Sequence, residues 1–167
     1  MNPIFEALKK WLSGSSSAHF ETDRSPRPFE RNRYKPGDLI EQLSRKQFQL
    51  VAGRWEVELD APIGEIGIEL PDAHGSYSRE AFAFLVEVLR HLVEMDNLVQ
   101  TEACEKPFVQ GQLGRENFEL GIGWITVTEA DLANETITIT YYGLKVNTQW
   151  DGKFKRDADG QWRPLNF

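Results

Sequence analysis

Apolar and polar residues in the first third of the chain form the patterns of a helix and of a β-hairpin. Between residues 38 and 46 the apolar residues recur at helical spacing, which predicts a short helix. In the segments 54–60 and 65–70 apolar residues alternate with other residues, as in strands that bury one face. The sequence "APIG" between these segments predicts a hairpin turn. The first strand has Trp55, Val57 and Leu59 on one face and Glu56, Glu58 and Asp60 on the other.

The main helical pattern extends over residues 78–106. Ser78 is a residue type that favours the position just before a helix. Apolar side chains cover a broad arc of this helix, whereas acidic residues and His91 gather in a stripe on the opposite side. A helix this apolar needs cover from more than one direction, and we expect a sheet to supply most of it. The arc contains Phe82, Leu85, Val86, Leu89, Leu92 and Val93.

Asp96 falls in the middle of this apolar arc. A buried and unpaired carboxylate would be costly, so the pattern favours a break of the helix near Met95–Asn97. Asp96 would then cap a second helix over residues 97–105 by accepting a hydrogen bond from a backbone N–H of its first turn. A buried functional acid and a plain exposed residue are the alternatives.

The last part of the chain carries strand patterns separated by short turns, which predicts an antiparallel meander. Asp159-Gly160 lies between the last two strands, where the glycine favours the positive φ of a hairpin turn. The sequence "DADG" at 157–160 matches part of a calcium loop, but the distant bidentate glutamate of such a loop is absent. The expected strands are 118–128, 135–142, 144–156 and 161–165.

Together these patterns predict a single α+β domain over residues 38–167. We expect an antiparallel sheet of about five or six strands, with the long, broken helix packed on one face. No β-α-β alternation recurs, which argues against an α/β fold. Residues 1–37 form a separate region, with a short amphipathic helix over 3–12 and an irregular basic connector over 14–37.

The formal charge of the chain is −7 and is unevenly distributed. Residues 1–36 hold seven Lys/Arg and four Asp/Glu, a net charge of +3, whereas residues 37–167 hold twelve and twenty-two, a net charge of −10. An acidic domain disfavours a nucleic-acid phosphate backbone as its main ligand and suits a basic protein partner. Solubility is the alternative reason for such a charge.

The sequence carries no motif typical of a catalytic nucleophile, of a phosphate-binding glycine loop or of a zinc site. Cys104 is the single cysteine, which excludes an internal disulfide and favours a reducing cytoplasm. No stretch approaches 18 uninterrupted apolar residues, so we expect no transmembrane helix. Glu87, His91 and Glu94 share one helical face, but a solvated acidic face explains that spacing better than a metal site. We therefore expect no cofactor.

The strand over 144–156 alternates clearly between apolar and polar residues. Trp150 and Phe154 are expected to point into the core, and the opposite row is rich in hydrogen-bonding side chains. Tyr142 and Trp162 could flank this row, which would give it the composition of surfaces that dock proteins. An ordinary solvated sheet face is the alternative. The candidate partner-binding residues are Tyr142, Lys145, Asn147, Gln149, Asp151, Lys153 and Trp162.

The order hairpin, helix, meander, together with "ITITYYGLKVNTQWDGKF", resembles small bacterial α+β proteins of unknown function. Some of these are similar to immunity proteins that are encoded beside polymorphic toxins. The resemblance covers about residues 50–165 and rests on the strand pattern, so it carries over no functional residue. It implies a cytoplasmic protein that binds and neutralises another protein.

The patterns leave two functions open. The first is a non-catalytic protein-binding module, of which an immunity-type protein that neutralises a basic toxin is one form. The second is a small-ligand binder or an enzyme with its site between the long helix and the sheet. His91, Glu94 and Asp96 are the candidate residues of that second site.

Overall fold

The computed structural model describes residues 33–106, 119–144 and 148–166. The predicted N-terminal helix and most of the basic connector lie outside the described residues. The described helices are α2 (Pro36–Arg45), α3 (Arg79–Arg90), α4 (Leu92–Glu105) and α6 (Glu129–Asn134). The described strands are β1 (Gln49–Val51), β2 (Arg54–Ala61), β3 (Gly64–Pro71), β4 (Leu120–Thr126), β5 (Thr136–Gly143), β6 (Gln149–Arg156) and β7 (Trp162–Asn166).

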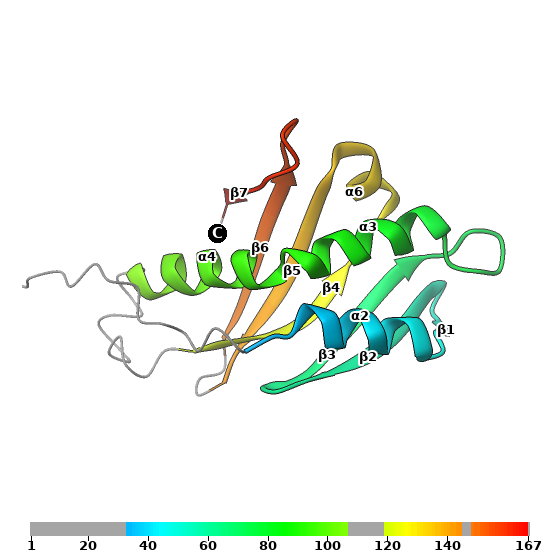
Figure 1. The fold of residues 1–167 in the computed structure, drawn as a ribbon, viewed down its shortest axis with the longest axis horizontal. Coiled ribbons are helices and arrows are strands. Elements are labelled where there is room, and N and C mark those ends of the chain that lie inside the picture. The colour runs from blue at the N-terminus through cyan, green and yellow to red at the C-terminus, as the bar shows by residue number, and fades with distance from the viewer. Residues whose placement is uncertain (1–32, 107–118, 145–147, 167) are drawn as a thin grey trace, which may run out of the picture.

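The seven described strands form one sheet in the order of the chain, from β1 to β7 (Figure 1). Every neighbouring pair is antiparallel except β3 and β4, which are parallel. A parallel pair needs a long crossover between its strands, and α3 and α4 supply it. The chain is therefore an α+β protein, as the sequence predicts. The sheet is mostly antiparallel rather than entirely so, because one parallel pair joins the N-terminal hairpin to the C-terminal meander.

Helices α2, α3 and α4 lie on the same face of the sheet (Figure 1). Their apolar side chains meet the inward rows of the strands, so the core lies between the two layers. The short helix α6 contacts α3 and β5 at one end of the sheet. None of the described helices is long and apolar enough to cross a membrane. Fully buried core residues include Leu85, Leu89, Leu92, Ile68, Ile125 and Ile139.

The long helical region breaks at His91 and not near Met95–Asn97, so that prediction is wrong. His91 separates α3 from α4, with φ −98° and ψ 5°. Asp96 lies inside α4 and is 2% exposed, so it does not cap a helix. Arg33 and Gln100 bind its carboxylate in the interior, which removes the reason for a break at this position.

Two short elements are missing from the sequence prediction, and the sheet has more strands than predicted. Strand β1 pairs with β2 through a turn at Ala52 and Gly53, whose φ values are both positive (48° and 84°). Its three residues are too few to show an alternating pattern. Helix α6 has six residues and begins with a capping box. In it, the side chains of Thr128 and Asp131 each accept a hydrogen bond from the backbone N–H of the other residue.

The hairpin turn predicted at Asp159-Gly160 is confirmed. Gly160 has a φ of 79° and lies between β6 and β7. The carboxylate of Asp157 accepts hydrogen bonds from two backbone N–H groups of this turn (2.9 and 3.0 Å), so it stabilises the turn. On the preceding strand, Phe154 is fully buried and Trp150 is half-buried against the core. The inward orientation predicted for these two side chains is also confirmed.

Ser78 caps the N-terminus of α3, as the sequence predicts. Its hydroxyl accepts a hydrogen bond from the backbone N–H of Ala81 (3.3 Å). Replacing Ser78 with alanine is expected to lower the free energy of unfolding by about 1 kcal/mol, because that N–H loses its partner. Urea unfolding measures the change, with Ser78→Asp as the control, since aspartate also caps helices. Equal losses in the two variants would contradict a capping role.

Candidate partner-binding face of the sheet

The face of the sheet that turns away from α2, α3 and α4 carries no described helix (Figure 1). We call it the open face. Because side chains alternate along a strand, every second residue of a strand lies on it. Strand pairing places Glu58, Gly67, Trp124, Thr140 and Asp151 in one row across five strands. The next row holds Gln49, Glu56, Glu69, Thr126, Thr138 and Lys153.

Acidic residues of β2 and β3 gather on one half of the open face. Glu56 stands directly opposite Glu69 on the neighbouring strand, and Asp60 stands opposite Glu65. Like charges in such positions destabilise a sheet, so these pairs cost the fold some stability. We call Glu56, Glu58, Asp60, Glu65 and Glu69 the acidic half of the open face.

The cations of the described residues neutralise only part of this acidic half. Nη1 of Arg54 lies 2.9 Å from Oε2 of Glu69, and Nζ of Lys46 lies 2.8 Å from Oδ2 of Asp60. These ion pairs leave a local excess of negative charge on β2 and β3. The carboxylates with no ion-pair partner among the described residues are those of Glu56, Glu58 and Glu65.

Two aromatic rings lie over glycines on the open face. Three ring atoms of Trp124 lie within 2.3–2.5 Å of the point that a Cβ atom of Gly67 would occupy, so the indole lies flat on this glycine. A Cβ atom at Gly123 would likewise lie 2.2 Å from Cδ2 of Tyr142. Neither glycine position has room for a side chain, which is how glycine within a strand permits close approach. Trp124 is half-buried and Tyr142 is 43% exposed.

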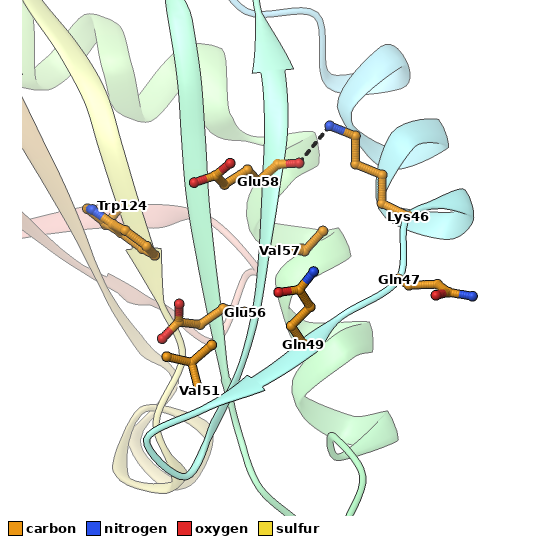
Figure 2. Close-up of a pocket in the computed structure, with 8 residues that line it drawn as sticks. All are labelled: Lys46, Gln47, Gln49, Val51, Glu56, Val57, Glu58 and Trp124. Carbon is orange, nitrogen blue, oxygen red and sulfur yellow. Dashed lines mark hydrogen bonds between the residues drawn. The ribbon is translucent and has the colours of Figure 1, made fainter.

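A groove of about 370 Å³ opens between β2 and Trp124 (Figure 2). Glu56 and Glu58 line it from β2, and their carboxylates point toward the side on which Trp124 lies (Figure 2). Gln49 and Val51 of β1 line it as well. The groove therefore combines two carboxylates and an indole with the side chains of Lys46, Gln47 and Gln49 and a small amount of aliphatic surface.

Side chains of α2 and of the residue after it close the edge of β2 beyond the short strand β1. The amide of Gln42 exchanges two hydrogen bonds with the backbone of Asp60 (2.9 and 2.8 Å), as a neighbouring strand would. Lys46 donates from Nζ to the backbone oxygen of Glu58 (2.7 Å; Figure 2). These contacts block the pairing of this part of β2 with another strand. A partner would therefore meet the open face rather than this edge.

The other half of the open face carries most of the partner-binding residues that the sequence suggests. Lys145 and Asn147 lie outside the described residues. Trp162 does not reach the open face, because it is 3% exposed and its ring stands edge-on to Phe84 in the core (5.7 Å between centroids). The remaining candidates share the open face and are exposed: Tyr142, Gln149, Asp151 and Lys153.

A second polar cluster lies in the interior, between α4 and β4. Nε of Arg33 lies 3.4 Å from Oδ2 of Asp96, without hydrogen-bond geometry, and Nη1 donates to Glu119 (3.2 Å). Gln100 donates to Asp96 (3.0 Å) and exchanges two hydrogen bonds with the backbone of Leu120 (2.9 and 3.1 Å). Arg33 also donates to the backbone oxygen of Leu120. The cluster thus ties the segment before α2 to both α4 and β4.

The three residues suggested for a site between helix and sheet are not brought together. Asp96 belongs to the interior cluster, whereas His91 lies on the exposed side of the helices with Glu87 (3.1 Å) and Glu94 (3.8 Å). Desolvation favours a higher pKa for Glu87, but hydrogen bonds from Arg90 and His91 outweigh it and lower this pKa. Among the described residues, no three His, Cys, Asp or Glu side chains are arranged to hold a metal ion.

Burial raises the pKa of Asp96 to about 6, although Arg33 and Gln100 favour its ionised form. Because this pKa is raised, the folded chain binds the proton of Asp96 more tightly than the unfolded chain does. The ionised carboxylate therefore lowers the stability fully above pH 6, and this loss disappears as the pH falls to about 4. Between about pH 7 and pH 5, the free energy of unfolding should rise by about 1 kcal/mol more in the unmodified chain than in Asp96→Asn. Urea unfolding at both pH values measures this difference, and an identical pH dependence of the two chains would contradict it.

The groove shared by the acidic strand β2 and Trp124 is the part of this site that the sequence does not show. The alternation in β2 already places Glu56 and Glu58 on one face. Trp124 joins them because β3 pairs with β4 in parallel and sets Gly67 opposite Trp124. Glycines inside the strand patterns "EIGIEL" and "LGIGW" were the available signal, since such glycines mark close approach.

Comparisons with known proteins add no relative to this picture. No protein-family model, curated protein or solved structure matched the chain. The function is therefore inferred from the charge, the aromatic rings and the groove of the open face.

Proposed function

We propose that this chain is a non-catalytic protein-binding module whose partner presents a basic surface to the open face. The acidic half carries the proposal, because three of its carboxylates have no ion-pair partner among the described residues. A basic partner would offset the repulsion between the opposed acid pairs on β2 and β3. Charge complementarity of this kind also speeds the encounter of two proteins and selects against acidic competitors.

The layer arrangement supports the same proposal. The core lies between the helices and the inward side of the sheet, so a partner on the open face would leave the core intact (Figure 1). Trp124 and Tyr142 place aromatic surface near the centre of this face, and aromatic residues recur as anchors at protein interfaces.

The buried Asp96 has a structural role in this proposal. A pKa of about 6 would suit an acid–base catalyst, but structural ion pairs produce shifted values as well. The carboxylate is already occupied by Arg33 and Gln100 in the interior. We therefore infer that Asp96 helps to hold α4 against β4, through its contacts with Arg33 and Gln100.

An immunity-type role is the specific form of this proposal that the resemblance in strand pattern suggests. The partner would then be a basic toxin that the chain neutralises inside a bacterial cell. Co-expression tests this role once a partner is captured. A partner that stops growth when expressed alone, but not together with this chain, would support it, and a partner that is harmless alone would contradict it.

Affinity capture from a lysate of the native host tests the binding proposal. Three full-length chains serve as bait: the unmodified chain, a Glu58→Lys, Glu65→Lys variant on the open face, and a Glu80→Lys, Glu105→Lys variant in the helix layer. The two variants have the same net charge, so they separate a local charge effect from an overall one. Elution with rising salt concentration measures the ionic part of the binding.

We expect the unmodified chain and the helix-layer variant to retain one basic protein in stoichiometric amount, and the open-face variant to lose it. Failure of the unmodified chain to retain any stoichiometric basic protein would contradict the proposal. Equal retention by all three baits would contradict it too, because the partner would then bind another surface.

A further inference from the structure

We infer that the groove between β2 and Trp124 binds one arginine side chain of the basic partner. The inference rests on the proposed function and assigns the central contact of the open face. The guanidinium would lie over the indole of Trp124 and bind the carboxylates of Glu56 and Glu58 (Figure 2).

Strand register builds this groove. Glu58 of β2, Gly67 of β3 and Trp124 of β4 are consecutive partners in one row across the sheet. Because Gly67 has no side chain, the indole occupies the space above it and extends toward β2. Glu56 lies two residues from Glu58 on the same face of β2, so both glutamates line the same space.

The carboxylates of the groove are among those that have no ion-pair partner in the described part of the chain. Lys46 also lines the groove, but its ammonium group donates to the backbone oxygen of Glu58 (2.7 Å) and to Asp60 (2.8 Å). Figure 2 shows Lys46 on the opposite side of β2 from Trp124. Among the described residues no cation pairs with Glu56 or Glu58, so their negative charge suits a cation supplied by the partner.

The indole distinguishes this place from an ordinary acidic surface. The face of an aromatic ring attracts a cation that lies over it, and tryptophan does so most strongly. Trp124 rests with its ring on Gly67 and is one of the residues that line the groove. Arginine suits such a place better than lysine, because a planar guanidinium stacks on the ring while its N–H groups bind carboxylates.

The volume of the groove agrees with a single side chain as its occupant. At about 370 Å³ it lies at the lower end of the range for small-molecule sites, so it suits one side chain better than a large cofactor. The two carboxylates repel phosphate and other anions, which leaves a cation as the expected ligand.

A titration of the full chain, followed by nuclear magnetic resonance, tests the inference. The probe is the blocked tripeptide Gly-Arg-Gly, and its control contains citrulline, which has a similar shape without the charge. The indole N–H signal of Trp124 is identified by its loss in Trp124→Phe. We expect the arginine peptide to shift this signal in a saturable way and the citrulline peptide to leave it unchanged.

Two charge-removing variants complete the test. A Glu56→Gln, Glu58→Gln variant should bind the arginine peptide about tenfold more weakly, since both counter-ions are lost. A Glu80→Gln, Glu105→Gln variant removes two charges from the helix layer and should bind as the unmodified chain does. The inference would be overturned by an absent or non-saturable shift, by equal shifts with both peptides, or by equal affinities of the two variants.

The inference and the proposed function can fail separately. If the captured partner binds the Glu56→Gln, Glu58→Gln variant as tightly as the unmodified chain, the groove is not its arginine site, while the open face still binds it. If the arginine peptide binds the groove but no basic protein is captured, the groove binds a cation and the proposed function is wrong.

Discussion

Replacing Arg33 with methionine is expected to lower the free energy of unfolding by about 3–5 kcal/mol, because it leaves a buried carboxylate without its cation. Among the described residues, Arg33 is the cation that pairs with Asp96, and it also donates to the backbone oxygen of Leu120. Burial already raises the pKa of Asp96 to about 6 with Arg33 present, so this pKa should rise further. Urea unfolding at neutral pH measures the loss of stability.

Two controls give this experiment its meaning. A double variant, Arg33→Met with Asp96→Leu, should recover much of the loss, because neither charge is then left unpaired in the interior. Arg45→Met breaks an exposed pair with Glu41 (2.6 Å) and should cost less than about 1 kcal/mol. A double variant that is no more stable than Arg33→Met alone would show that the buried pair is not the cause.

Gly67→Ala is expected to lower the free energy of unfolding by about 1–3 kcal/mol and to weaken binding of the arginine peptide about tenfold. The new Cβ atom would lie 2.3–2.5 Å from three ring atoms of Trp124, so the indole has to leave its place over β3. The substitution thereby removes the indole of Trp124 from the groove but keeps Glu56 and Glu58. Urea unfolding and the peptide titration measure the two effects.

Gly37→Ala is the matched control for this substitution. No atom lies within 4 Å of the Cβ position at Gly37, and its φ is not in the positive range, so alanine fits there without strain. Its affinity for the peptide should therefore match that of the unmodified chain, and its free energy of unfolding should stay equal or rise by up to about 1 kcal/mol. If the Gly67→Ala chain keeps the position of the Trp124 indole signal and the full affinity for the peptide, the claim that the indole lies on Gly67 is wrong.

Elements long enough to show a period could be predicted from the sequence. The helix α2, the hairpin of β2 and β3 and the strands of the meander each repeat their apolar positions often enough. The continuity of the helix at Asp96 could not be predicted, because the tolerance of this buried carboxylate depends on Arg33, far away in the chain. The spacing of residues along the sequence carries no information about such a partner. Without one, a helix cap at Asp96 costs less free energy than an unpaired buried carboxylate.

The open face could be predicted strand by strand but not as a whole. Alternation in the sequence shows the acidic row of β2 and the polar row of β6 separately. Their position on one face, with Trp124 between them, follows from strand order and from the parallel pair. Trp162 is aligned with Arg156 of β6, on the row that faces the core, so it cannot flank the polar row of β6.

Carboxylate labelling of the full chain, with and without the captured partner, tests the binding face most directly. A water-soluble carbodiimide couples an amine to accessible carboxylates, and mass spectrometry locates each labelled residue. We predict that labelling of Glu56, Glu58 and Glu65 falls in the complex, while labelling of Glu80 and Glu105 in the helix layer is unchanged. Protection of the helix-layer glutamates, with the three open-face glutamates still fully labelled, would contradict the open face as the site of binding.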